Sequence, residues 1–357
     1  MHVWTIFTIS LLVTVQRAAA SELAIHDKIF KDYQKNVRPV KDPNTITTVK
    51  VGFYYILILG VNAAQESVQF SMDFSQSWKD EYLTWDPAEF NGTQTIRVPE
   101  LLVWMPDIVM TESLSMSLLL PEEKRKAKID YDGTVSLWSP AVITHYCKMK
   151  IDNFPYDIQT CIIWFAPWAY PTTQVLPVIE LPPSGEYDDL QGNSEWEIVS
   201  FLPHERYSKS SDGNTYKELN FALTIKRNYV YYIAVLVIPT FVITTLCLLG
   251  IFSPFNNKAD REEKVSLGLT TLLTIAVILD IVAKEMPKAS KLPLLGYFVL
   301  AELLICTIAI LLSTVIIFLH ERALLSKWIA PAWHNRNSRQ KNVMNNIKDA
   351  DADVGSV

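Results

Sequence analysis

Two cysteines, Cys147 and Cys161, enclose thirteen residues and are the first candidates for chemistry in this chain. The chain has four cysteines, and the other two, Cys247 and Cys306, lie inside long apolar runs. Only the first pair can therefore form a bridge outside a membrane. The enclosed segment Phe154-Pro155-Tyr156-Asp157 combines aromatic residues with a turn-forming proline, which indicates a stapled surface lobe. If oxidised, the pair should contribute about 3 kcal/mol by constraining the unfolded chain. A reduced buried pair or half of a metal site is the alternative.

A second candidate is an apolar segment near residue 270 that carries hydroxyl groups at helical spacing. Five of its residues recur at intervals of four, three, four and four, which puts them on one helix face: Ser266, Thr270, Leu273, Val277 and Ile281. Five such helices around an axis would present hydroxyl rings that replace ion hydration and apolar rings that close by dewetting. The alternative is an ordinary membrane helix whose hydroxyls bond to its own backbone.

Two carboxylates, Glu262 and Glu263, directly precede the first hydroxyl of that face. A ring of such carboxylates would concentrate cations and repel anions. A solvated cluster of charges at a helix end is the alternative.

The sequence contains none of the common catalytic fingerprints. G-x-S-x-G, H-E-x-x-H, P-loop and dinucleotide motifs are absent, and the histidines His145, His204, His320 and His334 have no ligand spacing. Residues 21–228 hold 28 acidic against 19 basic residues, a net charge of -9 (19 - 28), which argues against nucleic-acid partners. We therefore expect no enzyme, no cofactor and no metal site.

The amino-terminal residues 1–20 resemble a secretory signal. An apolar stretch from Trp4 to Val15 precedes three alanines at 18–20, which supply small residues for cleavage. Secretion favours oxidation of the cysteine pair. It also makes Asn91, in the chain's single Asn-Gly-Thr sequon, a candidate for glycosylation.

Residues 21–228 show the pattern of an extracellular all-β sandwich. Short apolar or alternating runs, separated by turn signals such as Asp132-Gly133 and Asp212-Gly213, are typical of that fold. The clearest runs are Val51–Leu59, Val68–Phe74, Val135–Leu137 and Ala222–Ile225. The opening segment from Leu23 to Val37 predicts a short amphipathic helix.

A helical membrane domain at 229–319 follows, and the whole chain is 49% hydrophobic. Its spans are expected at 229–251, 263–283 and 292–319, because each run is long enough to cross a bilayer. With a cleaved signal the amino terminus lies outside, and three spans leave the tail at 320–357 in the cytoplasm. We expect this tail to be disordered. The sequence has no fourth apolar span.

These motifs, in this order, resemble the pentameric Cys-loop ligand-gated ion channels from about Leu23 to Leu319. Besides the loop 147–161, the resemblance rests on Trp78, Trp85-Asp86-Pro87, Trp104-Met105-Pro106-Asp107, Arg227, Ile238-Pro239, Glu263-Lys264-Val265-Ser266-Leu267-Gly268, Met286-Pro287-Lys288 and Leu292-Pro293-Leu294. Nicotinic-like, cation-conducting members are the most similar, since anion-conducting members carry a Pro-Ala insertion where this chain has Glu262-Glu263.

The resemblance implies an aromatic box that holds a cationic amine by cation–π attraction. Trp168 matches its central tryptophan, and Tyr207 and Tyr216 match the two tyrosines of the mobile loop that caps it. Thr111 replaces a tyrosine and Asp73 a tryptophan, and the capping loop lacks the adjacent cysteine pair of alpha-type subunits. The implied agonist is therefore left open between an amine, a choline ester and a proton.

The family mechanism implies that the loop 147–161 transmits ligand binding to the pore. Phe154, Pro155, Asp157 and Arg227 would act on the connector from Pro287 to Pro293. The resemblance also implies a plasma-membrane receptor, in a homo- or heteropentamer surrounded by lipid, with a synapse as one expected location.

Two departures motivate alternative functions. The family has four membrane helices per subunit, so a three-span chain could be a truncated, non-conducting partner that modulates full-length subunits. A proton-gated channel is the other alternative, because burial could raise the pKa of carboxyl groups at Asp73, Asp280, Glu285 or Glu302.

Overall fold

The computed structural model describes residues 22–182, 187, 189–211, 213–253, 258–284, 286 and 291–325, with backbone only at 258–262, 321 and 323–325. Contacts divide the described chain into two compact units. One contains the residues up to Val235 together with Asp280–Tyr297, and the other contains Leu236–Leu279 and the residues from Phe298 onward. The predicted signal at 1–20 lies outside the described residues, as does the predicted tail at 320–357 apart from residues 320–325, which are helical rather than disordered.

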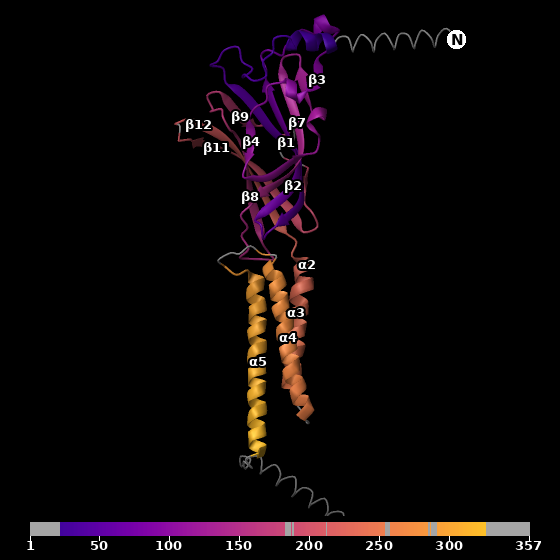
Figure 1. Cartoon of the computed structure of the whole chain (residues 1–357), viewed down its shortest axis with the longest axis vertical. Coiled ribbons are helices and arrows are strands. Elements are labelled where there is room, and N and C mark those ends of the chain that lie inside the picture. The colour runs from indigo at the N-terminus through magenta and orange to yellow at the C-terminus, as the bar shows by residue number, and fades with distance from the viewer. Residues whose placement is uncertain are drawn as a thin grey trace, which may run out of the picture. The chain divides into compact units, whose positions relative to one another are not determined.

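The first unit contains two β-sheets (Figure 1). The eight-stranded sheet has the order β10-β1-β2-β7-β6-β3, with β9 also on β1 and β5 also on β7. Its strands are β1 (Thr47–Asn62), β2 (Ser67–Lys79), β3 (Thr95–Pro99), β5 (Ser113–Leu118), β6 (Lys126–Asp130), β7 (Thr134–Tyr146), β9 (Val175–Ile179) and β10 (Leu190–Gln191). The four-stranded sheet has the order β11-β12-β8-β4 and consists of β4 (Ile108–Thr111), β8 (Ile158–Pro167), β11 (Trp196–Lys209) and β12 (Thr215–Arg227).

Alternation along the strands builds the core between these sheets. In β12 and β8 the odd-numbered residues are mostly buried and the even-numbered ones more exposed, as the pleat requires. Phe53 of the larger sheet packs against Phe221 of the smaller one with ring centroids 4.5 Å apart, and also contacts Phe165 and Phe201. This aromatic contact stabilises the sandwich.

Short 3-10 turns η1 (Pro87–Phe90), η2 (Glu100–Leu102) and η3 (Glu122–Lys124) connect the strands. Between β6 and β7, Gly133 has a φ of +88°, and a Cβ there would lie 2.3 Å from the carbonyl oxygen of Asp80. The predicted Asp132-Gly133 turn therefore requires glycine on both conformational and steric grounds.

Three helices are long and apolar enough to cross a membrane among the described residues: Val230–Phe252, Glu263–Lys284 and Leu294–His320. The first consists of α2 (Val230–Tyr232), a π-helical segment η4 (Ile233–Val237) and α3 (Ile238–Phe252). The π segment ends two residues before Pro239, which lacks the N–H for a regular helical bond. The others lie within α4 (Lys258–Lys284) and α5 (Leu294–Leu325). The expected sandwich followed by three apolar helices is confirmed.

The amino-terminal prediction was partly wrong. The helix spans 22–30 instead of continuing to Val37. Leu23 is exposed on it, while Ile25 and Ile29 are buried. Tyr33 explains the early end, because its hydroxyl donates to the carboxylate of Asp80 at 2.6 Å, 47 residues away. This tertiary bond outweighs the local helical pattern.

Candidate functional site

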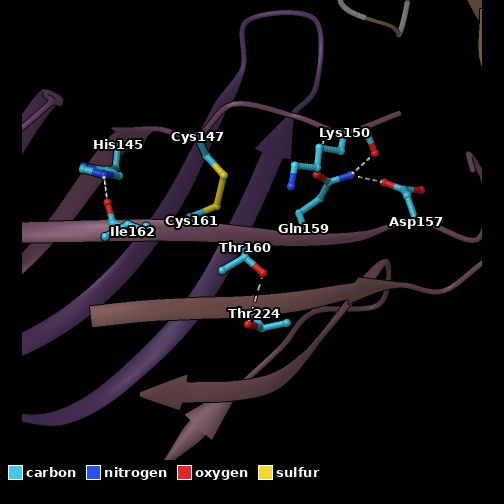
Figure 2. The surroundings of a disulfide bond; sticks show 9 residues. All are labelled: His145, Cys147, Lys150, Asp157, Gln159, Thr160, Cys161, Ile162 and Thr224. Atoms are coloured by element: carbon cyan, nitrogen blue, oxygen red, sulfur yellow. Dashed lines mark hydrogen bonds between the residues drawn. A yellow bond between two sulfur atoms is a disulfide. The ribbon is translucent and has the colours of Figure 1, made fainter. Parts of the chain in front are cut away.

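A disulfide joins Cys147, just after β7, to Cys161 within β8 (Figure 2). Both cysteines are buried, and the loop they close (residues 147–161, the Cys loop) lies at one end of the sandwich. Beside the bridge, a ring nitrogen of His145 lies 3.0 Å from the carbonyl oxygen of Ile162, which links β7 to β8 and so one sheet to the other. Burial lowers the pKa of the His145 side chain, since desolvation disfavours its charged form.

Gln159 ties the two limbs of the Cys loop together, as Figure 2 shows. Its amide oxygen accepts the Lys150 N–H at 2.8 Å, and its amide nitrogen donates to the Lys150 carbonyl at 2.9 Å and to Asp157 at 2.6 Å. Gln159 is buried, so these bonds are shielded from water. Sequence reasoning missed this residue, because a glutamine two positions after Asp157 carries no signal of a bond across the loop.

Arg227, the last residue of β12, is the charged centre of this end of the sandwich. Its Nε lies 2.9 Å from Asp157 Oδ1, and its Nη1 lies 2.5 Å from Glu195 Oε1. The guanidinium also lies 4.1 Å from the ring centroid of Trp196 and 4.9 Å from that of Phe154. Arg227 is 5% exposed and Asp157 is 2% exposed, so neighbours rather than water balance the charges.

Tyr232 in α2 extends this cluster into the start of the first apolar helix. Its hydroxyl donates to Glu195 at 2.7 Å and its ring meets Phe154 with centroids 4.9 Å apart. Asp157, Phe154 and Arg227 were predicted from the sequence, whereas Glu195 and Tyr232 were not. A buried arginine next to an apolar helix is the one signal that could have prompted a search for further partners.

The segment before α5 bonds directly to the Cys loop. The N–H of Leu294 donates to the carbonyl of Asp152 at 3.1 Å, and the N–H of Leu295 donates to that of Phe154 at 3.2 Å. Lys291 and Asp152 form an exposed ion pair at 3.9 Å. Of the predicted coupling prolines, Pro155 and Pro293 are buried here. Pro287 lies outside the described residues.

Trp168 follows β8 and is 76% exposed. Asp107 holds its backbone, because the Asp107 carbonyl accepts the Trp168 N–H at 3.1 Å and its carboxylate accepts the Ala169 N–H at 2.5 Å. Thr111 pairs with Trp164 across β4 and β8, and Trp164 pairs with Asn220 across β8 and β12.

Tyr216 lies on the outer face of the smaller sheet, together with Asn220 and its pair Trp164. This follows from strand alternation, because Tyr216 lies four residues from Asn220 on β12. Tyr207 lies on the opposite face. The register pairs Tyr207 with Lys217 and Ser208 with Tyr216, and adjacent residues of a strand point to opposite sides. The Lys217 ammonium is 5.9 Å from the Tyr207 ring centroid and 2.9 Å from Glu205.

Asp73 belongs to β2 of the larger sheet, in register with Tyr55 and Pro140, and not to the sheet that carries Trp164 and Tyr216. One of its carboxylate oxygens is buried without a hydrogen-bond partner in the described part of the protein. Burial raises the pKa of Asp73.

On α4, the side chains predicted to share a helix face are all exposed in the single chain: Ser266, Thr270, Leu273, Val277 and Ile281. The Thr270 hydroxyl donates to the backbone carbonyls of Ser266 and Leu267 at 2.9 Å. Such bonds are expected in an ordinary membrane helix whose hydroxyls bond to its own backbone. Glu263 is exposed as well, whereas the side chain of Glu262 is not among those described.

Lys264, next to Glu263, has its ammonium at the end of α3. It donates to the carbonyl oxygen of Ile251 at 3.3 Å and to that of Ser253. These carbonyls form the negative end of a helix and favour a cation.

Asn91 is exposed at the end of η1, as a glycan acceptor requires.

The sequence matches the models of one protein family over both parts of the chain. Residues 22–229 match the model of the neurotransmitter-gated ion-channel ligand binding domain, and residues 236–352 match that of the neurotransmitter-gated ion-channel transmembrane region. The chain belongs to the neurotransmitter-gated ion-channel family. It is accordingly a receptor-type membrane protein rather than an enzyme.

Several relatives are subunits of receptors or ion channels. The neuronal acetylcholine receptor subunit alpha-9 of Gallus gallus is 30% identical over 93% of this chain and 68% of the relative. The acetylcholine receptor subunit alpha-1-A of Xenopus laevis is 28% identical over 90% of this chain and 70% of the relative. The proton-gated ion channel subunit pbo-6 of Caenorhabditis elegans is 27% identical over 92% of this chain and 78% of the relative.

Proposed function

We propose that this chain is a subunit of a pentameric, cation-selective channel of the plasma membrane that an extracellular ligand opens. The observation that carries the proposal is the bonded contact between the Cys loop and the segment before α5. Two backbone hydrogen bonds, from Leu294 and Leu295, join the two, and Arg227 links the same loop to the strand that leads into α2. A displacement of β12 would thereby act on the start of two apolar helices.

Cation selectivity is supported by the distribution of charge at the start of the second apolar helix. Lys264 donates to carbonyls at the end of α3, whereas Glu263 beside it is exposed. In a ring of five α4 helices the carboxylates would then face the lumen without an adjacent ammonium, and such a ring favours cations. The exposed face from Ser266 to Ile281 would line the pore, and the glycan at Asn91 and the amino terminus would lie outside the cell.

A small cationic amine is the agonist class that the outer face of the smaller sheet favours. Trp168 is 76% exposed on a backbone that Asp107 holds in place, and Tyr216 lies on the outer face of the smaller sheet. A cation over such rings gains roughly 1–2 kcal/mol per good contact. Tyr207 lies on the opposite face and would contact the same amine only if the β11–β12 hairpin twists.

Protons are the second candidate ligand. Asp73 has a buried, unpartnered carboxylate oxygen and a raised pKa, and one relative is a proton-gated channel subunit. Asp73 would face Trp168 of the neighbouring subunit in a pentamer.

Voltage-clamped oocytes expressing the chain, challenged with amines, choline esters and acid steps, test both candidates. For an amine agonist, Trp168→Phe should raise the half-maximal concentration and Trp168→Ala should raise it further, following cation–π strength. Equal responses in all three proteins would refute an amine site at Trp168. An acid response that survives Asp73→Asn would refute the proton site.

A further inference from the structure

A cavity of about 530 Å³ opens in the first unit between the turn after helix 22–30 and the loop that follows β2. Cavities of roughly 300–1,000 Å³ hold small organic molecules. The residues that matter for recognition are Ile29, Asp32, Tyr33, Val37, Arg38 and Tyr82. Trp168, Tyr207, Tyr216 and Asp73 are not part of its lining.

Arg38 supplies a fixed positive charge to this cavity. Its guanidinium donates to the carbonyls of Thr45 and Gln174 at 2.8 and 2.9 Å and to that of Pro43 at 2.7 Å. Arginine has five N–H groups, so two remain after these three bonds. Carbonyl oxygens orient the guanidinium without neutralising it, and within the described residues it has no carboxylate partner.

Asp32 supplies the opposite charge. It forms no ion pair with any described residue, Arg38 included. Lys28, the other charged residue at this cavity, already pairs with Glu89 at 2.6 Å. The cavity therefore has one uncompensated cation and one uncompensated anion.

Besides the polar residues Gln34 and Thr84, the cavity exposes apolar surface. Val37 is 64% exposed and Tyr82 is 49% exposed, so an occupant would remove apolar surface from water. The hydroxyls of both tyrosines are already used, since Tyr82 donates to the Val40 carbonyl and Tyr33 to Asp80. Their rings, rather than their hydroxyls, are left to contact an occupant.

We propose that this cavity binds a small zwitterion with a compact apolar body, its carboxylate at Arg38 and its ammonium at Asp32. A path leads from the cavity toward Trp168. The Tyr33 hydroxyl accepts the Trp104 N–H at 2.9 Å, and the ring of Trp104 contacts Tyr170 with centroids 6.3 Å apart, two residues beyond Trp168. Through these contacts the occupant would modulate the agonist response. This modulation rests on the proposed function, whereas binding to the cavity does not.

The test is a titration of the purified full chain in lipid nanodiscs, followed by ligand-observed NMR. L-phenylalanine is the zwitterionic probe, phenethylamine has only the ammonium, and 3-phenylpropionate has only the carboxylate. We expect L-phenylalanine to bind with a dissociation constant of about 1 mM or tighter, and each single-charge probe to bind about tenfold more weakly.

Variants locate the binding. Val37→Trp fills the cavity and should abolish the signal, whereas Val199→Trp, at an exposed valine on β11, should not. Asp32→Asn should reduce L-phenylalanine to the affinity of 3-phenylpropionate. Absence of binding by all probes, binding unaffected by Val37→Trp, or binding lost in Trp168→Ala would overturn the proposal.

The two proposals fail separately. Binding that depends on Val37 in a protein without ligand-evoked current would uphold the cavity and refute the channel function. In conducting cells, L-phenylalanine should shift the half-maximal agonist concentration of the wild type and leave that of Val37→Trp unchanged. An equal shift in both would refute modulation through the cavity.

Discussion

Replacing Asp157 by asparagine removes the negative charge that faces Arg227 and keeps the shape of the side chain. Both residues are almost fully buried, at 2% and 5% exposure, and breaking a buried ion pair costs about 3–5 kcal/mol. Glu195 stays near the guanidinium but is 40% exposed, so it compensates only in part. We expect Asp157→Asn to destabilise the Cys loop by about 3 kcal/mol, at the lower end of that range.

The hydrogen bonds lead to the same expectation. Asp157 accepts from Arg227 and from Gln159 at once. An asparagine has one acceptor and one donor end, so either Arg227 or Gln159 would face an amide N–H. Rotating the Gln159 amide would instead disrupt its two bonds to the backbone of Lys150.

Hydrogen exchange of residues 147–161, measured by mass spectrometry on the full chain in nanodiscs, would report this loss. A change of about 3 kcal/mol in local opening corresponds to exchange faster by about two orders of magnitude. The matched control Glu195→Gln removes a half-exposed partner of the same arginine and should accelerate exchange less than about tenfold.

The reasoning fails if Asp157→Asn accelerates exchange no more than Glu195→Gln does. It also fails if Asp157→Asn and Arg227→Gln have additive effects in the double variant. Partners in a buried pair must couple, because removing the second charge relieves the first loss.

Further predictions concern the disulfide, the buried histidine, the acid response and the lysine beside the carboxylate ring. Cys147→Ser should lower the free energy of unfolding by about 3 kcal/mol, given the disulfide's sequence separation of 14 residues. It should also lower the thermal midpoint far more than Cys247→Ser does. Because the folded-state pKa of His145 lies below its unfolded value, the wild type should lose stability as pH falls below roughly 6.5. His145→Gln should flatten that part of the midpoint-against-pH curve, and an unchanged slope would contradict the assignment. If acid evokes a current at a pH above the range in which ordinary aspartates titrate, Asp73→Asn should remove that current. Lys264→Gln should leave the reversal potential unchanged, and a shift further toward the cation potential would show that its ammonium faces the lumen.

The strands and apolar helices were predictable because their signals are local. Alternating runs such as Val68–Phe74 lie within β2, and the charge-free run after Arg227 is long enough for a membrane helix. The cysteine pair was predictable from its spacing and from the absence of another pair outside the apolar runs.

Contacts between distant segments could not be predicted in this way. The coupling role of Arg227 and Asp157 was predicted only through a family resemblance, since 70 residues separate them. Gln159 and Glu195 complete the cluster through bonds that no local pattern indicates. The end of the first helix likewise depends on the distant bond between Tyr33 and Asp80.

The faces of the β11–β12 hairpin depend on its register, which a sequence alone leaves open. Tyr207 and Tyr216 can be read as two walls of one pocket. Once Ser208 pairs with Tyr216, however, Tyr207 points to the other side with Lys217. A one-residue change of register would reverse this assignment.

The reversal potential of the ligand-evoked current tests the central claim most directly. When external NaCl is diluted tenfold, a cation-selective pore should shift its reversal potential by up to about 59 mV toward negative values. Glu263→Gln should reduce that shift. A shift of similar size toward positive values, or a shift unaffected by Glu263→Gln, would contradict the account of a cation pore with Glu263 at its mouth.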